Sequence, residues 1–173
     1  TMQAFGYDPL PDYTEPLESP ISQPELAEEY PLIMACGGRS FEFFHSEHRQ
    51  MPHLRALNPN PEFEIHPDTA EKYGVHHGDW CWIENHLGRV QLKANVSPVL
   101  DPSTISLDHA WWFPERAAED TGNGCYDTYV SNANVIIEAG CGESRFGNNC
   151  KSHMCRVYAC APEEIIGDTD MDE

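Results

Sequence analysis

Hydrophobic and polar residues alternate along this chain in short runs that Gly, Pro and Asn separate, a pattern typical of β-strands and turns. The alternation is clearest in GRVQLKANV, residues 88–96, where Val90, Leu92, Ala94 and Val96 occupy every second position. Because successive side chains of a strand point to opposite faces, this spacing puts the four apolar residues on one face. We therefore expect residues 88–96 to form a strand with one buried face.

Five other runs have the length and composition of strands. They are PLIMAC (31–36), EFEI (62–65), WCWIE (80–84), TISLDH (104–109) and HMCRVYAC (153–160). WCWIE and GRVQLKANV predict a hairpin around residues 85–88. HPDTAEKYGV predicts a short helix that begins at Pro67 or Asp68 and ends at Gly74. Six short strands and one small helix predict a mostly β domain, and a barrel is the arrangement that we expect.

The connection from residue 113 to residue 149 is too long for a simple link between two strands. It is rich in Gly and Asn and is interrupted by the apolar run NVII. Its Trp, Asn and Cys content favours an ordered functional loop over a flexible surface loop. The stretch GCGESRFGNN, residues 140–149, contains three glycines and is expected to face a ligand.

The formal net charge of −19 is concentrated at the two ends of the sequence. Residues 1–30 carry seven acids and residues 161–173 carry six, and neither segment contains a Lys or Arg. We expect residues 1–30 to be an extended acidic arm without regular structure, apart from one helical turn at PELAEEY, that packs through Phe5, Tyr7 and Tyr13. Residues 31–161 would then be the barrel and residues 162–173 a solvated acidic tail. Nucleic-acid binding needs a basic surface and is excluded.

No apolar run is long enough for direct membrane insertion, and no signal peptide is recognisable. The first residues read like the middle of a polypeptide, so we expect a fragment whose parent is cytoplasmic or exported by an upstream signal. The seven cysteines form no CxxC pair and match no common zinc or iron–sulfur spacing. Cys81, Cys155 and Cys160 are expected to be small buried groups.

The candidate chemistry lies in GGRSFEFFHSEHRQMPHLR, residues 37–55. Its three histidines suggest a metal site, but no acidic partner stands at a diagnostic distance and H-E-x-x-H is absent. G-x-S-x-G, G-x-G-x-x-G and Walker motifs are absent as well. Gly37 and Gly38 let the backbone approach a ligand closely, and Arg39 can pair with a phosphate or a carbonyl edge. This combination favours binding of an anion or a heterocycle.

From Tyr30 to Cys160 the chain resembles the C-terminal cofactor-binding domain of the molybdopterin oxidoreductases, the dimethyl-sulfoxide-reductase superfamily. Six stretches carry the resemblance, in family order. They are YPLIMACGGR, FHSEHRQMPHLR, EFEIHPDTAEKYGVHHGDWCWIENHLGRVQLKANVSPVLDPSTI, HAWWFPE, SNANVI and KSHMCRVY. FHSEHRQMPHLR is similar to the version in an acetylene-hydratase-like branch, and FGYDPLPDYTEPLESP resembles the connector before this domain.

The resemblance implies a six-stranded double-psi β-barrel with short helices and long ordered loops. It also implies binding of molybdopterin guanine dinucleotide with molybdenum or tungsten, while the metal ligand and any iron–sulfur cluster belong to other domains. The histidine-rich loop would then form part of the wall around the pterin and its pyrophosphate. The implied cofactor-binding residues are Gly37, Gly38, Arg39, His45, Ser46, His109, Trp111, Asn134 and Lys151. Cys36 departs from the Thr of many members, which puts a hydroxyl contact there in doubt.

Taken alone, such a domain is not catalytic, and the parent enzyme is expected to be an oxidoreductase. Its partners would be the remaining domains of the same catalytic subunit and an iron–sulfur electron-transfer subunit. A free-standing pterin-cofactor carrier or protein-binding barrel is an alternative, and a parent hydratase or hydroxyltransferase is another. An aspartate decarboxylase on the same fold is disfavoured because the chain contains no Gly-Ser pair to cleave. Of Trp111 and Trp112, one is expected to serve the core.

Overall fold

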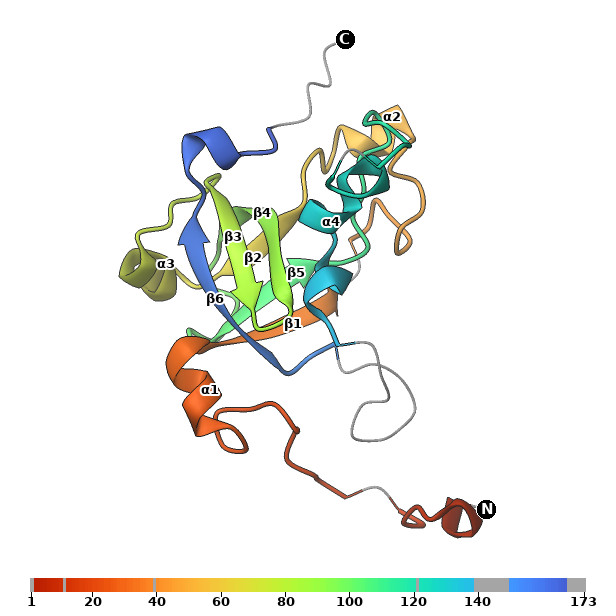
Figure 1. Cartoon of the computed structure of the whole chain (residues 1–173), viewed down its shortest axis with the longest axis vertical. Coiled ribbons are helices and arrows are strands. Elements are labelled where there is room, and N and C mark those ends of the chain that lie inside the picture. The colour runs from red at the N-terminus through yellow and green to blue at the C-terminus, as the bar shows by residue number, and fades with distance from the viewer. Residues whose placement is uncertain (1, 11, 39, 121, 139–149, 168–173) are drawn as a thin grey trace.

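A closed barrel of six strands forms the centre of the computed structural model, which describes residues 2–10, 12–38, 40–120, 122–138 and 150–167 (Figure 1). The strands are β1 (Leu32–Gly38), β2 (Glu62–Ile65), β3 (Trp80–Asn85), β4 (Gly88–Val96), β5 (Thr104–Asp108) and β6 (His153–Ala159). Their order around the barrel is β1-β5-β2-β4-β3-β6. The pairs β1–β5 and β2–β4 are parallel and the other four pairs are antiparallel.

The six-stranded, mostly β barrel expected from the sequence is confirmed, and each predicted run forms a strand. β3 and β4 form the predicted hairpin, in which Asn85 pairs with Gly88. The first strand is longer than predicted, because it continues through both glycines to Gly38. Its pairing with β5 shifts register between Cys36 and Gly38, so the chain leaves the barrel through an irregularity.

The predicted helix is α3 (Pro67–Tyr73). His66 precedes it and accepts a hydrogen bond from the backbone N of Asp68 at 3.2 Å. Gly74 ends the helix in the left-handed conformation, φ 65°, which glycine adopts without strain. The other helical turns are η1 (Met2–Phe5), α1 (Pro24–Glu29), α2 (Pro52–Arg55), η2 (Cys125–Asp127), α4 (Thr128–Ser131), η3 (Ala133–Ile136) and η4 (Pro162–Glu164).

The barrel interior is filled by the alternating apolar residues of the strands. Val90, Leu92 and Ala94 of β4 are buried as predicted, and Val96 is half-buried. The opposite face of β4 is not simply solvent-exposed, however, since Gln91 is only 1% exposed. Its amide donates to the carbonyl O of Glu164 at 2.7 Å and its side-chain oxygen accepts from Ile166 N at 3.0 Å.

The C-terminal acidic segment is therefore partly docked on the barrel, where a solvated tail was expected. Glu164 also accepts a hydrogen bond from Trp82 Nε1 at 3.1 Å, and Arg116 Nη2 donates to Ile166 O at 3.0 Å. Polar groups of β3, of β4 and of the loop after β5 hold this segment. Residues 168–173 lie outside the described part of the chain.

The N-terminal arm also differs from expectation. It contains the predicted turn at α1 and an additional turn at η1. Two of the three predicted aromatic anchors are wrong, since Phe5 is 77% and Tyr13 is 79% exposed, whereas Tyr7 is half-buried. Glu18, which was not predicted as an anchor, also holds the arm, because its buried carboxylate accepts hydrogen bonds at the start of β6.

A second hydrophobic cluster lies outside the barrel, under the loops that follow β1 and β5. It consists of Phe43, Trp80, Trp111 and Phe113. Trp111 is the inward-facing residue of the Trp111–Trp112 pair, with no exposed surface. This cluster gives the two loops a rigid support.

Candidate cofactor-binding site

The site is built at the edge of the barrel where two parallel strands end. β1 and β5 pair in parallel from Ile33–Thr104 to Gly38–Asp108, so their carboxyl ends lie together. Two long loops leave from this edge, and Figure 1 shows residues 40–60 and 109–138 gathered on one side of the barrel. Side chains 60 or more residues apart in sequence can therefore meet there.

Two histidines, one from each loop, contact each other at this edge. Nδ1 of His45 lies 2.8 Å from Nε2 of His109, and Nδ1 of His109 lies 3.0 Å from the carbonyl O of Gly38. The rings meet edge to face, with centroids 5.1 Å apart. A continuous hydrogen-bonded chain thus runs from the end of β1 through both histidines.

A buried arginine forms hydrogen bonds to the backbone of the same two loops. Nη1 of Arg49 donates to the carbonyl O of His45, and Nη2 donates to that of His109 at 3.1 Å. Its guanidinium lies 4.7 Å from the ring centroids of both Phe43 and Trp111, and the residue is 3% exposed. Burial lowers the pKa of Arg49 to about 10, against the favourable charge of Asp108, so it remains protonated at neutral pH.

Sequence reasoning missed Arg49, which stands in the quoted motif but carried no assigned role. A signal was available: an arginine inside an aromatic run is a candidate for a cation–π sandwich. Arg55, also unassigned, is 2% exposed and occupies a similar position at 4.8 Å from the Trp111 ring. It donates to Pro59 O and to Glu115, so it supports the loop without contacting either histidine carbonyl.

The backbone at the site is strained. His45, His48 and Ala110 adopt positive φ angles of 52°, 76° and 54°. Non-glycine residues rarely take this left-handed conformation, which costs about 1 kcal/mol or more each, and such residues cluster at functional sites. The Arg49 hydrogen bonds to His45 O and His109 O hold the peptide groups next to two of these three residues.

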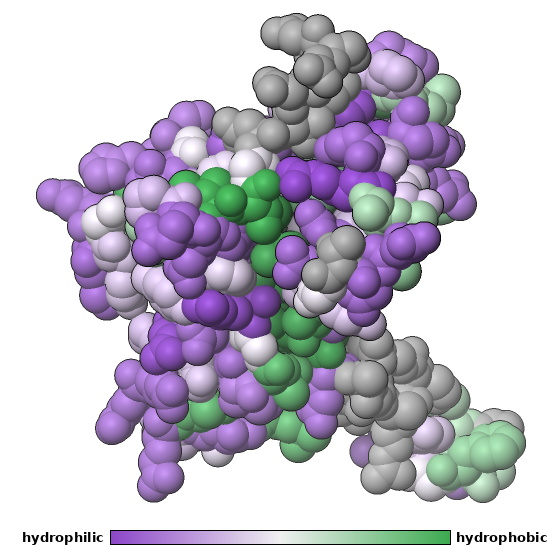
Figure 2. All heavy atoms as spheres, turned by 45° about the horizontal axis from the view of Figure 1, so that its top comes forward, coloured by the Kyte–Doolittle hydropathy of each residue, from purple (hydrophilic) through white to green (hydrophobic). Residues whose placement is uncertain are grey.

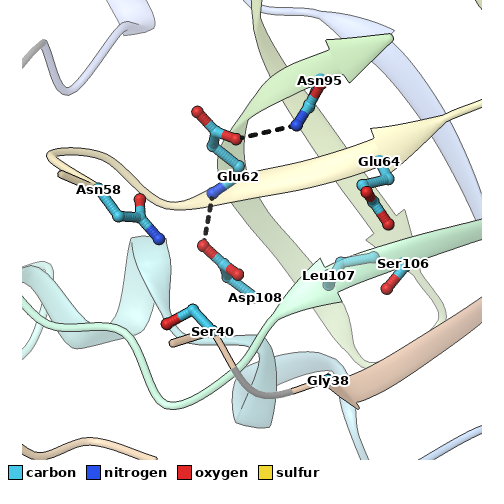
Figure 3. Close-up of a pocket in the computed structure, with 9 residues that line it drawn as sticks. All are labelled: Gly38, Ser40, Asn58, Glu62, Glu64, Asn95, Ser106, Leu107 and Asp108. Carbon is cyan, nitrogen blue, oxygen red and sulfur yellow. Dashed lines mark hydrogen bonds between the residues drawn. The ribbon is translucent and has the colours of Figure 1, made fainter. Parts of the chain in front are cut away.

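A cavity of about 210 Å³, whose lining is shown in Figure 3, shares Gly38, Ser40 and Asp108 with the small cavity around the histidines. It is lined by Gly38, Ser40, Asn58, Glu62, Glu64, Asn95, Ser106, Leu107 and Asp108. Asp108 accepts from Glu62 N at 3.1 Å, and the Glu62 carboxylate accepts from Asn95 Nδ2 at 3.2 Å. Burial raises the pKa of Asp108 to about 6, although hydrogen bonds from Glu62 N and Asn58 and the charge of Arg49 oppose the rise. The cavity is rich in hydrogen-bond acceptors and suits ligands that present N–H groups.

Four of the predicted site residues lie together at this edge: Gly38, His45, Ser46 and His109. The carbonyl O of Ser46 accepts from Trp112 Nε1 at 2.6 Å. Trp112 had been considered only as a core candidate, yet it joins the two loops, whereas Trp111 lies buried beneath them.

The remaining predicted residues surround this group less closely. Gly37 has φ 97°, and a Cβ added at Gly37 or Gly38 would meet nothing within 4 Å, so a ligand can approach the backbone. Lys151 follows Cys150, whose carbonyl O accepts from Cys36 N at 2.7 Å, and therefore stands near the end of β1. Asn134 is exposed on η3, which packs on the β3–β4 turn through Asn85 Nδ2 and Ile136 O at 2.7 Å. Arg39 and the loop 140–149 lie outside the described residues.

Within the described ranges, no group of three or more His, Cys, Asp or Glu side chains is placed to hold a metal ion. No helix in those ranges is long and apolar enough to cross a membrane. Cys36, Cys81 and Cys155 are buried, and burial raises the pKa of each thiol; for Cys36 it reaches about 12. Cys36 therefore belongs to the core, while Cys160 is only half-buried.

The fold is thus a closed six-stranded barrel with polar side chains gathered on two strand-end loops beside a cavity at one edge. The chain matches the family model described as "Molydopterin dinucleotide binding domain" over residues 33–152. It belongs to that family, within the dimethyl-sulfoxide-reductase superfamily.

Several known proteins are similar to this chain. It is 37% identical to dopamine dehydroxylase from Eggerthella lenta over 155 residues, which is 89% of this chain and 15% of that protein. It is 42% identical to acetylene hydratase from Syntrophotalea acetylenica over 114 residues, 66% of this chain and 16% of that protein. The solved structure of acetylene hydratase from Pelobacter acetylenicus superposes with a TM-score of 0.84 at 32% identity, covering 92% of this chain and 22% of that one.

The chain thus corresponds to a small portion of much larger enzymes. It spans about one sixth of the length of the curated relatives above. The activities in their names belong to those whole proteins.

Proposed function

We propose that this chain binds molybdopterin guanine dinucleotide at the edge where β1 and β5 end, as one domain of a larger molybdenum or tungsten enzyme. The observation that carries the proposal is the contact of His45 and His109, which joins the two strand-end loops beside an acceptor-rich cavity. The bound cofactor supplies the metal centre. The residues of this chain hold and orient the organic part.

The chemistry of the cavity fits the heterocyclic parts of such a cofactor. Pterin and guanine rings present several N–H groups, and Glu62, Glu64 and Asp108 offer carboxylate acceptors to them. The open space at Gly37 and Gly38 leaves room for a ring or a pyrophosphate against the backbone. We assign charge pairing with the pyrophosphate to Arg39 and Lys151, and an amide hydrogen bond to Asn134.

The parent enzyme is proposed to be an oxidoreductase, with residues 31–161 as the barrel, 1–30 as the connector arm and 162–173 as the tail. The names of relatives support two reaction classes: dehydroxylase and reductase on one side, hydratase on the other. Large hydrophobic side chains remain exposed on the arm and the first loop, among them Phe5, Ile21 and Phe41, and a hydrophobic band is visible in Figure 2. Such surface suits packing against the remaining domains of the same subunit.

A free-standing cofactor carrier is the second candidate, because the barrel closes on its own core. The two candidates differ in the size of the native polypeptide. An antibody raised against this chain should detect a band several times heavier than 19.5 kDa in extracts of the source cells. A band near 19.5 kDa would favour the carrier.

Cofactor binding is tested directly by adding extracted molybdopterin guanine dinucleotide to the purified chain and following its fluorescence. We expect saturable binding that His109→Ala weakens about tenfold, because His109 joins His45 to the end of β1. His76→Ala is the matched control, since His76 is exposed beyond α3 and pairs with Asp79. Equal affinities for the wild type and His109→Ala would contradict the proposal.

A further inference from the structure

We infer that His45 and His109 are held in one tautomeric arrangement, and that Arg49 is the positioning residue that maintains it. In this arrangement, Nε2 of His45 is a hydrogen-bond acceptor for an N–H group of the cofactor. This role of Nε2, the cofactor half of the inference, rests on the proposed function above. The arrangement of protons within the pair does not, because it follows from the contacts of this chain alone.

The tautomers follow from the contact of His109 with a backbone carbonyl. The carbonyl O of Gly38 can only accept, so Nδ1 of His109, 3.0 Å away, carries a proton. A neutral His109 then has a lone pair on Nε2, and Nδ1 of His45, 2.8 Å away, must donate to it. Nε2 of a neutral His45 is consequently left with a lone pair. Among the described residues it has no hydrogen-bond partner, and His45 is exposed.

The contact between the two rings admits one proton. Two protons between Nδ1 of His45 and Nε2 of His109 would place N–H groups face to face at 2.8 Å. Within the described residues, the charged groups that line the small cavity around both histidines are Arg49 and Asp108. The Arg49 guanidinium is buried and binds the carbonyls of both histidines, so it holds the two rings in this contact.

A neutral pair selects one kind of ligand group. A lone pair on His45 accepts N–H or O–H donors and repels phosphate oxygens, while a protonated histidine would do the reverse. The neighbouring cavity offers only further acceptors among its charged groups: Glu62, Glu64 and Asp108. The edge next to His45 therefore receives a pterin or guanine ring, and the pyrophosphate lies elsewhere.

Arg49 positions the pair without needing to touch the ligand. Its two hydrogen bonds fix the peptide groups of His45 and His109, and the rings of Phe43 and Trp111 hold its guanidinium in place. Lysine cannot reproduce the planar fork that binds two carbonyls at once. Arg55 is a matched control, because it packs on the same Trp111 ring but donates to Pro59 and Glu115.

The first test is ¹⁵N NMR of the histidine rings in the 173-residue chain at pH 7.5. We expect both His45 and His109 to show a protonated Nδ1 and an unprotonated Nε2. In Arg49→Lys we expect at least one of the two rings to lose this pattern and sample both tautomers, while Arg55→Lys retains the wild-type signals. An Nε2-protonated or doubly protonated His109 in the wild type, or equal effects of the two lysine variants, would overturn the inference.

The second test uses pterin and inorganic pyrophosphate as separate probes at pH 7.5. Pterin binding should weaken severalfold in His45→Ala, whereas pyrophosphate binding should not depend on His45. Pyrophosphate binding that is lost in His45→Ala while pterin binding is unchanged would overturn the acceptor role. If neither probe nor cofactor binds while the NMR pattern holds, the proposed function and the cofactor half fail and the tautomer lock stands.

Discussion

Nδ1 of His153 lies 3.0 Å from Oε2 of Glu18, and both side chains are almost completely buried. The backbone N of Met154 donates to the other carboxylate oxygen of Glu18. Residues 135 positions apart are thereby joined, one on the N-terminal arm and one at the start of β6. Since Met34 of β1 pairs with His153, the arm is fixed beside the strand that leads into the site.

Removing the Glu18 carboxylate should loosen the arm and destabilise the barrel. Glu18→Ala leaves the backbone N of Met154 without its acceptor in a buried place and deprives His153 of the carboxylate. We expect a loss of roughly 2–3 kcal/mol in the free energy of unfolding, measured by urea denaturation at pH 7. Glu28→Ala, at an exposed position of α1, is the control and should change stability little. A loss below about 0.5 kcal/mol for Glu18→Ala would show that the arm is not anchored there.

The same contact predicts a pH dependence. Burial alone would raise the pKa of Glu18, but hydrogen bonds from His153 and Met154 N outweigh it and lower the pKa below the usual 4.5. A carboxyl with a lowered folded-state pKa stabilises the fold above its unfolded value and loses that contribution as the pH falls through the folded value. The stabilities of the wild type and Glu18→Ala should therefore converge as the pH falls below 4.5, and a difference that stays constant in acid would contradict this.

Gly37 and Gly38 should respond differently to alanine. Gly37 has φ 97°, so Gly37→Ala should cost about 1 kcal/mol or more through backbone strain, while Gly38, with open space and no positive φ, should tolerate alanine. Thermal unfolding of both variants measures this difference. If ligand and backbone are in contact here, both variants should also weaken binding of molybdopterin guanine dinucleotide. Equal stability losses would contradict the strain argument.

The barrel could be predicted because strand periodicity is a local signal. The alternation of Val90, Leu92 and Ala94 reports which face is buried, whatever the rest of the chain does. The order of the strands around the barrel is not a local property, and it was not predicted from the sequence. The burial of Gln91 could not be predicted, because it depends on residues 164–166, which return to β4 from more than 70 positions away.

The candidate site residues had two sources. Gly38 was chosen from its own chemistry, while His45, Ser46 and His109 were implied by the family resemblance, and their place as cofactor contacts stays a prediction. Arg49 was missed because a buried charge looks like a surface charge in sequence until its two carbonyl acceptors are known. The sequence does not indicate which carbonyls Arg49 binds, since every residue has a backbone carbonyl. Glu18 was missed as an anchor of the arm because only aromatic residues were considered there.

The docked C-terminal segment should depend on Gln91. Gln91→Ala removes the side-chain partners of Glu164 O and Ile166 N, and we expect a loss of about 1–2 kcal/mol in stability. We also expect a protease to remove the residues after Pro162 faster in this variant than in the wild type, and mass spectrometry measures the rate of removal. Glu163→Ala, at an exposed position of the same segment, is the control. Cleavage at the wild-type rate in Gln91→Ala would show that Glu164 and Trp82 suffice to hold the segment.

The contribution of Asp108 to the free energy of unfolding should fall as the pH rises towards neutral. Burial raises its pKa from 3.8 to about 6, so the folded state holds a proton that the unfolded state has released between these values. This contribution is fully present below pH 3.8 and is lost as the pH rises through about 6, which amounts to at most about 3 kcal/mol. Asp108→Asn, which keeps an acceptor for Glu62 N, should flatten the stability profile between pH 4 and 6.5 and match or exceed the wild type at pH 7.5. Carbon-detected NMR of the Asp108 carboxyl should give a midpoint near 6. A midpoint below 4, with parallel stability profiles for the two proteins, would contradict this prediction. It would mean that water or an ion reaches the Asp108 carboxylate. The edge of the cavity would then not have the low dielectric constant that selection of a ligand by its acceptors requires.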